Sequence, residues 1–270
     1  MTAHSSARAG SSEPDAGLDA ALLEESDADP YPAFAATVAL RQLAQWLPLT
    51  PVSVLDLSLP LPDASAGFDS RVSDVVMAAG HRVVSVSRGA PEGAARRHSR
   101  PSVVGDPRSL TWIRSESVDA IVAEGGALSD SLATEDTLRD IARILRPGGR
   151  LLASADSLVL GLARLAEQNR WPELADAPAA DVVLAPDPEH EGNFFRYFAP
   201  DDLAELLTGC GLEVEWVRPR TALPAAAIRR TLLSEPDSMG DLVLSELSLA
   251  AEQAGEAHGA RLVVSGRKPA

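Results

Sequence analysis

The segment from Val52 to Ser58, VSVLDLS, constrains the fold of this chain more than any other. Its apolar run is typical of a buried strand, and an acid, Asp56, follows the run. A proline-containing loop comes next, then a helix whose apolar stripe stops at Gly80, then a second strand, His81–Arg88. This order predicts the opening βαβ unit of a doubly wound α/β domain, in which ligands bind beyond the carboxyl ends of the strands.

The alternation of strand and helix patterns continues to the end of the chain. We expect a helix at 33–46 before the first strand, and further strands at 102–106, 119–123, 150–155, 212–218 and 261–266. Further helices are expected at 91–99, 134–145 (with Thr134 as N-cap), 157–168 and 201–208, and two within 223–256. The prediction is one α/β domain over 29–270 with a doubly wound, mostly parallel, seven-stranded sheet. We interpret residues 157–200 as a lid or insertion, and the acidic segment 1–28 as disordered.

Charge and composition limit the partners. The formal net charge is −15, which repels phosphate backbones and anionic lipids, so neither nucleic acid nor membrane is expected as a partner. The basic stretch 87–100 is interpreted as a solvated helix face. A single cysteine, no long apolar run and no apolar signal core together predict a cytoplasmic protein without an intrachain disulfide. The oligomeric state stays open.

Two later segments carry a family resemblance. LRPGGR at 145–150, just before a strand, and YFAPDDLAELLTGCGLEVEWV at 197–217 resemble motifs of the class I S-adenosylmethionine (SAM) dependent methyltransferases. The resemblance implies a Rossmann-like methyltransferase fold, SAM as cofactor, and methyl transfer to a small-molecule or peptide acceptor. Methyl transfer mainly requires that donor and acceptor be held in line, so the absence of a catalytic triad does not exclude it.

The resemblance also implies cofactor-binding positions around the first strand. Asp56 matches the acid that ends this strand in the family, but Ser58 and two prolines follow where the family has a glycine-rich loop. Proline fixes φ and removes an amide donor, which is the opposite of what glycine provides there. Gly67, at the expected entrance of the next helix, is the glycine that remains. At the end of the second strand Ser87, followed by Arg88, stands where the family has an acid for the ribose.

The later cofactor positions are better kept. Asp106 matches the acid near the adenine amino group, and Glu124 and Gly125 match the segment beside the methyl group. Glu124 is the one candidate for a catalytic residue, and the catalytic base stays unassigned. Tyr31, His190 and Tyr197 are candidates for substrate contact, and no spacing of ligands suggests a metal site.

Each of these positions has a plainer alternative. Asp56 fits a structural hydrogen-bonding role, Asp106 a turn, and Tyr31 and Tyr197 the packing of a core. At the level of function, the altered cofactor positions favour a non-catalytic methyltransferase-like binding or scaffold subunit, or an enzyme with different chemistry on this fold. The sequence leaves these alternatives open beside the methyltransferase.

Overall fold

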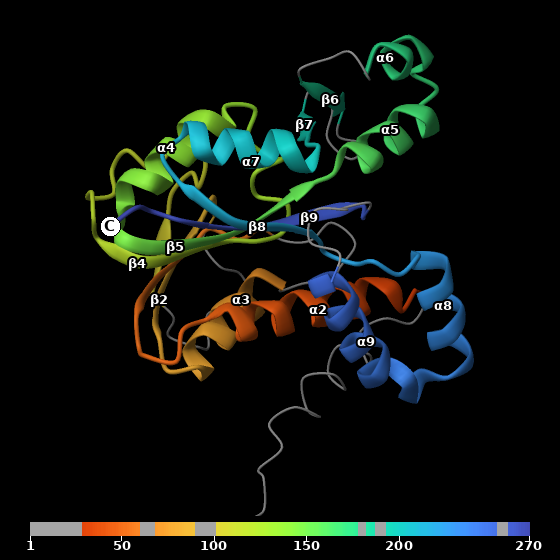
Figure 1. Ribbon diagram of the computed structural model, residues 1–270, viewed down its shortest axis with the longest axis horizontal. Coiled ribbons are helices and arrows are strands. Elements are labelled where there is room, and N and C mark those ends of the chain that lie inside the picture. The colour runs from red at the N-terminus through yellow and green to blue at the C-terminus, as the bar shows by residue number, and fades with distance from the viewer. Residues whose placement is uncertain (1–28, 60–67, 90–100, 178–181, 187–192, 253–258) are drawn as a thin grey trace, which may run out of the picture.

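A seven-stranded sheet between two layers of helices forms the body of the protein (Figure 1). The structure is a computed structural model that describes residues 29–59, 68–89, 101–177, 182–186, 193–252 and 259–270. The strands of this sheet are β1 (Ser53–Asp56), β2 (Arg82–Ser87), β3 (Ser102–Val104), β4 (Val118–Ala123), β5 (Leu145–Asp156), β8 (Glu213–Pro219) and β9 (Arg261–Arg267). Their order across the sheet is β3-β2-β1-β4-β5-β9-β8.

The sheet is mostly parallel, as predicted. β1 pairs in parallel with β2 on one side and with β4 on the other, and only β9 runs antiparallel to its neighbours β5 and β8. The strand order reverses beside β1, where the connections from β1 and from β4 leave to opposite sides. The carboxyl ends of β1, β2, β3 and β4 therefore lie together at one edge, where doubly wound sheets bind ligands.

Helices cover both faces of the sheet. One face carries α4 (Thr134–Ile144) and α7 (Pro200–Gly209), and the other carries α2 (Tyr31–Trp46), α3 (Phe68–Ala78), α8 (Ala225–Ser234) and α9 (Met239–Glu252) (Figure 1). The apolar residues Phe34, Val38 and Leu43 of α2 are fully buried against the sheet and the neighbouring helices. Leu138 and Ile141 of α4 are fully buried on the opposite face. None of the described helices is both long and apolar enough to cross a membrane.

The segment predicted as a lid forms a small unit of its own at one end of the sheet (Figure 1). It contains α5 (Leu158–Glu167), α6 (Trp171–Asp176) and an antiparallel hairpin of β6 (Val183–Pro186) and β7 (Phe194–Tyr197). The ring of Tyr197 lies in its core, against Gly161 of α5, where any added Cβ would come within 2.5 Å of the ring. The hairpin is joined to the loop after β4 by the amide of Arg196, which donates to the carbonyl of Ser129 at 3.0 Å.

Two helices lie between the last two strands. α8, a short 3-10 helix (η3, Pro236–Ser238) and α9 connect β8 to β9, as the pattern of 223–256 predicted, and they pack beside α2. Glu246 of α9 is fully buried and accepts hydrogen bonds from the backbone amides of Ala222 and Leu223. Burial raises the pKa of the Glu246 carboxyl, against the opposing effect of these two amides.

Two local predictions need correction. Thr134 is not the N-cap of α4: its hydroxyl donates to the carbonyls of Leu128 and Ser131, so it fastens the preceding loop and leaves the helix without a side-chain cap. The predicted helix 134–145 ends one residue early, because Leu145 already pairs with Val118. The predictions for 1–28, 91–99, Gly67 and His190 lie outside the described residues.

Candidate functional site

The structure brings the predicted site residues of four strands to one edge of the sheet. Asp56 ends β1, Ser87 ends β2, Asp106 follows β3, and Glu124 follows β4. Because the four strands are parallel neighbours, their ends form one continuous row. What each residue can offer a ligand depends on the partners that it already has.

Both carboxylate oxygens of Asp56 already have hydrogen-bond partners within the protein. Its side chain is buried; one oxygen accepts from the amide of Ser58 at 3.0 Å and the other from the hydroxyl of Ser73 at 2.6 Å. Ser73 lies on α3, so the carboxylate fastens the end of β1 to the following helix. This geometry supports the structural alternative for Asp56.

The chain after β1 continues straight along β4. The amide of Leu57 donates to the carbonyl of Val122 at 2.8 Å, and that of Leu59 donates to the carbonyl of Glu124 at 3.0 Å. The hydroxyl of Ser58 accepts from the amide of Glu124 at 3.1 Å. Gly125 has φ +77°, and a Cβ on it would overlap the carbonyl of Leu59, so only glycine fits here.

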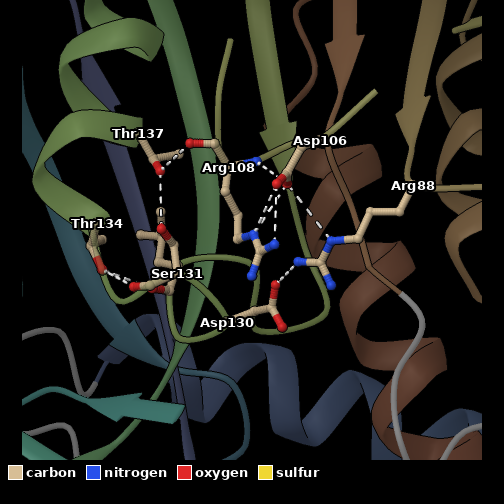
Figure 2. A network of polar contacts seen from close by, with 8 residues as sticks. Arg88, Asp106, Arg108, Asp130, Ser131, Thr134 and Thr137 are labelled. Carbon is tan, nitrogen blue, oxygen red and sulfur yellow. Dashed lines mark hydrogen bonds and ion pairs between the residues drawn. The ribbon is translucent and has the colours of Figure 1, made fainter. Parts of the chain in front are cut away.

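Asp106 lies in a network of exposed charges (Figure 2). Arg108 donates to it from its backbone amide (3.0 Å) and from its guanidinium (3.1 Å), and the guanidinium of Arg88 lies 3.7 Å away and also pairs with Asp130. The hydrogen bond from the Arg108 side chain is the main cause that lowers the pKa of Asp106. Asp106, Arg88 and Arg108 are each more than 40% exposed, and exposed ion pairs contribute only about 0–1 kcal/mol. A ligand can therefore displace these arginines from Asp106.

Hydroxyl groups of α4 and its preceding loop hold this network in position. Thr137 donates to the carbonyl of Arg108 at 3.0 Å, and its hydroxyl lies 3.2 Å from that of Ser131 (Figure 2). The loops after β3 and β4 are thus joined through α4. Between them and the end of β1, a hollow beside Leu57 and Leu59 has a volume of only about 10 Å³, which is room for about one water molecule.

Glu124 forms a buried ion pair with Arg220. Arg220 follows β8, and its guanidinium donates both to Glu124 and to the side-chain oxygen of Gln42 on α2. The side chains of Glu124 and Arg220 are 2% and 5% exposed. The second carboxylate oxygen of Glu124, Oε1, is buried without a hydrogen-bond partner among the described residues. An acceptor of this kind is rare in a folded protein and is suited to a ligand that donates.

Two further contacts close this side of the site. The hydroxyl of Tyr31 lies 3.2 Å from that of Thr221, next to Arg220, so the start of α2 meets the end of β8. Tyr197, in contrast, has its ring in the core of the lid and accepts from Arg164 at 2.9 Å. Arg220, Thr221 and Gln42 were not among the predicted site residues. No local pattern marks them, because they reach Glu124 only through tertiary contacts.

Among the described residues, neither the cysteine nor the acidic residues indicate a nucleophilic or metal site. Cys210 ends α7, and burial raises the pKa of its thiol, which disfavours a nucleophilic thiolate. Among the described residues, no cluster of three or more histidine, cysteine or acidic side chains is arranged to hold a metal ion.

Comparisons with known proteins show which kind of domain this chain resembles. Residues 62–153 match the family model described as a methyltransferase domain. This segment, which contains α3, β2, β3, β4 and α4, is similar to a methyltransferase domain. No curated protein matches the chain by sequence.

Solved structures with low sequence identity share the methyltransferase fold. A putative SAM-dependent methyltransferase from Listeria monocytogenes is 14% identical with a TM-score of 0.59, over 88% of this chain and 99% of that one. A SAM-dependent methyltransferase from Mesorhizobium loti is 16% identical with a TM-score of 0.54, over 87% and 98% of the two chains. The 1,6-didemethyltoxoflavin-N1-methyltransferase of Burkholderia thailandensis, solved with its substrate and S-adenosylhomocysteine, is 17% identical with a TM-score of 0.51, over 98% and 94%. The comparisons support SAM as the cofactor of such a domain.

The residues at this edge of the sheet fit SAM at one end of the expected site and not at another. Asp106 is exposed, and its ion pairs with Arg88 and Arg108 can be displaced. Its carboxylate is therefore accessible to the adenine amino group of SAM. At the ribose end, Ser87 donates its hydroxyl to the carbonyl of Gly89 at 2.7 Å, and Arg88 adds a positive charge where an acid is expected. Much of the loop after β1, including Gly67, lies outside the described residues.

Proposed function

We propose that this protein is a SAM-dependent methyltransferase that acts on a small-molecule or peptide acceptor. The observation that carries the proposal is Glu124, a buried acid with one free oxygen, at the end of β4 in a methyltransferase domain. When bound, SAM supplies an electrophilic methyl group. The protein's own residues would bind the two partners, exclude water and receive the proton that the acceptor loses.

The surroundings of Glu124 define its proposed role. Arg220 pairs with the carboxylate and places a cation beside it in a buried position. Its free Oε1 can then accept a hydrogen bond from an N–H or O–H of the acceptor and take up the released proton. Asp106 would hold the adenine amino group, with Arg88 and Arg108 displaced towards solvent. Tyr31, which meets the end of β8 beside Arg220, remains a candidate for contact with the acceptor.

A second candidate function is a non-catalytic methyltransferase-like scaffold. Three observations favour it. Both carboxylate oxygens of Asp56 already accept hydrogen bonds from the protein itself, and Ser87 and Arg88 stand where an acid for the ribose is expected. The hollow between the loops is also too small for a cofactor, at about 10 Å³. In that case the fold would be retained for binding a partner, and no cofactor would bind. The two proposals differ in one measurable quantity, the affinity for the cofactor or its product.

Titration calorimetry with S-adenosylhomocysteine separates the two proposals. The methyltransferase should show one site with micromolar or tighter affinity. Asp106→Ala should weaken binding by roughly 10- to 150-fold, which corresponds to the loss of a charged hydrogen bond of about 1.5–3 kcal/mol, and Asp106→Asn should fall in between. Asp136→Ala, which removes a 75% exposed acid on α4, is the matched control and should change nothing. No heat and no thermal shift at millimolar ligand would support the scaffold.

A turn role for Asp106 gives the opposite pattern. If Asp106 only supports its loop, Asp106→Ala should lower stability by about 1 kcal/mol while affinity stays unchanged. Urea denaturation of the same variants measures that stability. Unchanged affinity with reduced stability would remove Asp106 from the site.

A further inference from the structure

A second cleft lies on the other side of the sheet from α4 and α7. It has a volume of about 310 Å³ and lies between the end of α2, α9 and the strands β5, β8 and β9. This volume is in the range of about 300–1,000 Å³ that small-molecule sites occupy. Its walls combine apolar side chains (Trp46, Trp216, Leu247 and Val263) with two arginines, Arg150 and Arg218. The proposed methyltransferase reaction uses none of these residues.

One of the two arginines is already neutralised. Arg150 pairs with Glu215 at 2.7 Å, donates to the carbonyl of Trp46 at 3.4 Å, and lies 5.1 Å from the centre of the Trp46 ring. Glu215 in turn accepts from the hydroxyl of Ser265, which also accepts from the indole of Trp46 at 2.9 Å. This network of contacts pairs Arg150 with an acid, so Arg150 adds no net charge to the cleft.

Arg218 is the arginine without a counter-ion. Its guanidinium carbon lies 4.5 Å from the centre of the Trp216 ring, so the side chain is held by stacking. Among the described residues, its buried Nε has no hydrogen-bond partner and its guanidinium forms no ion pair. A stacked guanidinium presents a fixed fork of donors that matches a carboxylate. The cleft therefore combines one uncompensated positive charge with an apolar wall.

We propose that this cleft binds a small organic monoanion with a flat apolar body, of the aromatic carboxylate class. The carboxylate would pair with the guanidinium of Arg218, and the body would pack on Trp216, Leu247 and Val263. A monoanion is favoured because Arg218 is the one charge in the cleft that lacks a counter-ion among the described residues, and because the chain's net charge of −15 repels multiply charged anions. This inference is independent of the proposed methyltransferase activity.

Calorimetry with 2-naphthoate tests the proposal on the full chain. Saturable one-site binding is expected, with 2-naphthamide, the neutral analogue of the same shape, at least ten-fold weaker. Arg218→Met keeps the length of the side chain but removes its charge, and it should weaken naphthoate binding by roughly 10- to 150-fold. Arg218→Lys keeps the charge without the fork and should fall in between. Arg170→Met, which changes an arginine of α6 outside the cleft, is the matched control and should bind as the wild type does.

A blocking variant locates the bound probe. Leu247→Trp adds bulk to the wall of the cleft without changing its charge, so it should abolish naphthoate binding. Circular dichroism and melting curves show which variants are folded, and if Arg218→Met is not, Arg218→Lys and the naphthamide comparison decide. Equal binding of naphthoate and naphthamide, equal binding by all folded variants, or no saturable binding by the wild type would each overturn the proposal.

Discussion

Replacing Arg220 by methionine tests the buried ion pair at the centre of the candidate site. The change keeps most of the apolar volume but leaves the carboxylate of Glu124, which is 2% exposed, without its cation. Removing one partner of a buried pair destabilises a protein by about 3–5 kcal/mol. For a domain of this size each kcal/mol lowers the melting temperature by roughly 2–4 °C, so a fall of roughly 6–20 °C is expected.

The double variant Glu124→Gln with Arg220→Met provides the control. It removes both charges, and replacing both members of a buried pair is often close to neutral. We expect the double variant to be more stable than Arg220→Met alone, with a coupling energy of about 2 kcal/mol or more from urea denaturation of all four proteins.

If Arg220→Met lowers the free energy of unfolding by less than about 1 kcal/mol, or if the double-mutant cycle shows no coupling energy, Glu124 and Arg220 do not form a buried pair in which each charge needs the other.

Two further predictions concern backbone space and the buried acid of α9. Gly125→Ala should prevent stable folding because its Cβ would overlap the carbonyl of Leu59, whereas Gly211→Ala, with φ +89° and open space, should cost only about 1–2 kcal/mol in chemical denaturation. Equal effects of the two glycine variants would contradict the close approach. Glu246 has a raised pKa in the folded protein, so its ionisation lowers stability as pH rises above the ordinary pKa of a glutamate, 4.5. The melting temperature of Glu246→Gln relative to the wild type should therefore increase from pH 5 to pH 8, and a constant or falling difference would exclude this effect.

The elements of the fold were predictable where the signal is local. The apolar run before Asp56, the stripe ending at Gly80 and the β-branched run of β2 each depend on neighbours in sequence, and each element formed at the expected place. Gly80 has φ +84°, as its predicted role at a helix end requires. The row of acids at strand ends also followed from the predicted order of parallel strands.

The partners of those acids were not predictable. Glu124 and Arg220 are 96 residues apart, and their pairing depends on how β8 and α2 come together beside the end of β4. The hydrogen bond from the hydroxyl of Thr134 to the carbonyl of Leu128 was not predictable either, because it depends on the path of the loop before α4. A pattern in the sequence indicates which residues lie at an edge of the sheet, but not which neighbours neutralise them.

The position of α2 has a consequence for how the chain folds during synthesis. Trp46 bonds to Ser265 across 219 residues, Tyr31 to Thr221 across 190, and α9 packs beside α2. One flank of this apolar helix therefore stays uncovered until β9, the last strand, has left the ribosome. Such non-local contacts slow folding and leave apolar surface exposed to aggregation in the meantime. A chain that lacks β9 would leave this flank of α2 uncovered, because the bond between Trp46 and Ser265 could not form. α2 and β9 therefore depend on each other in the folded protein.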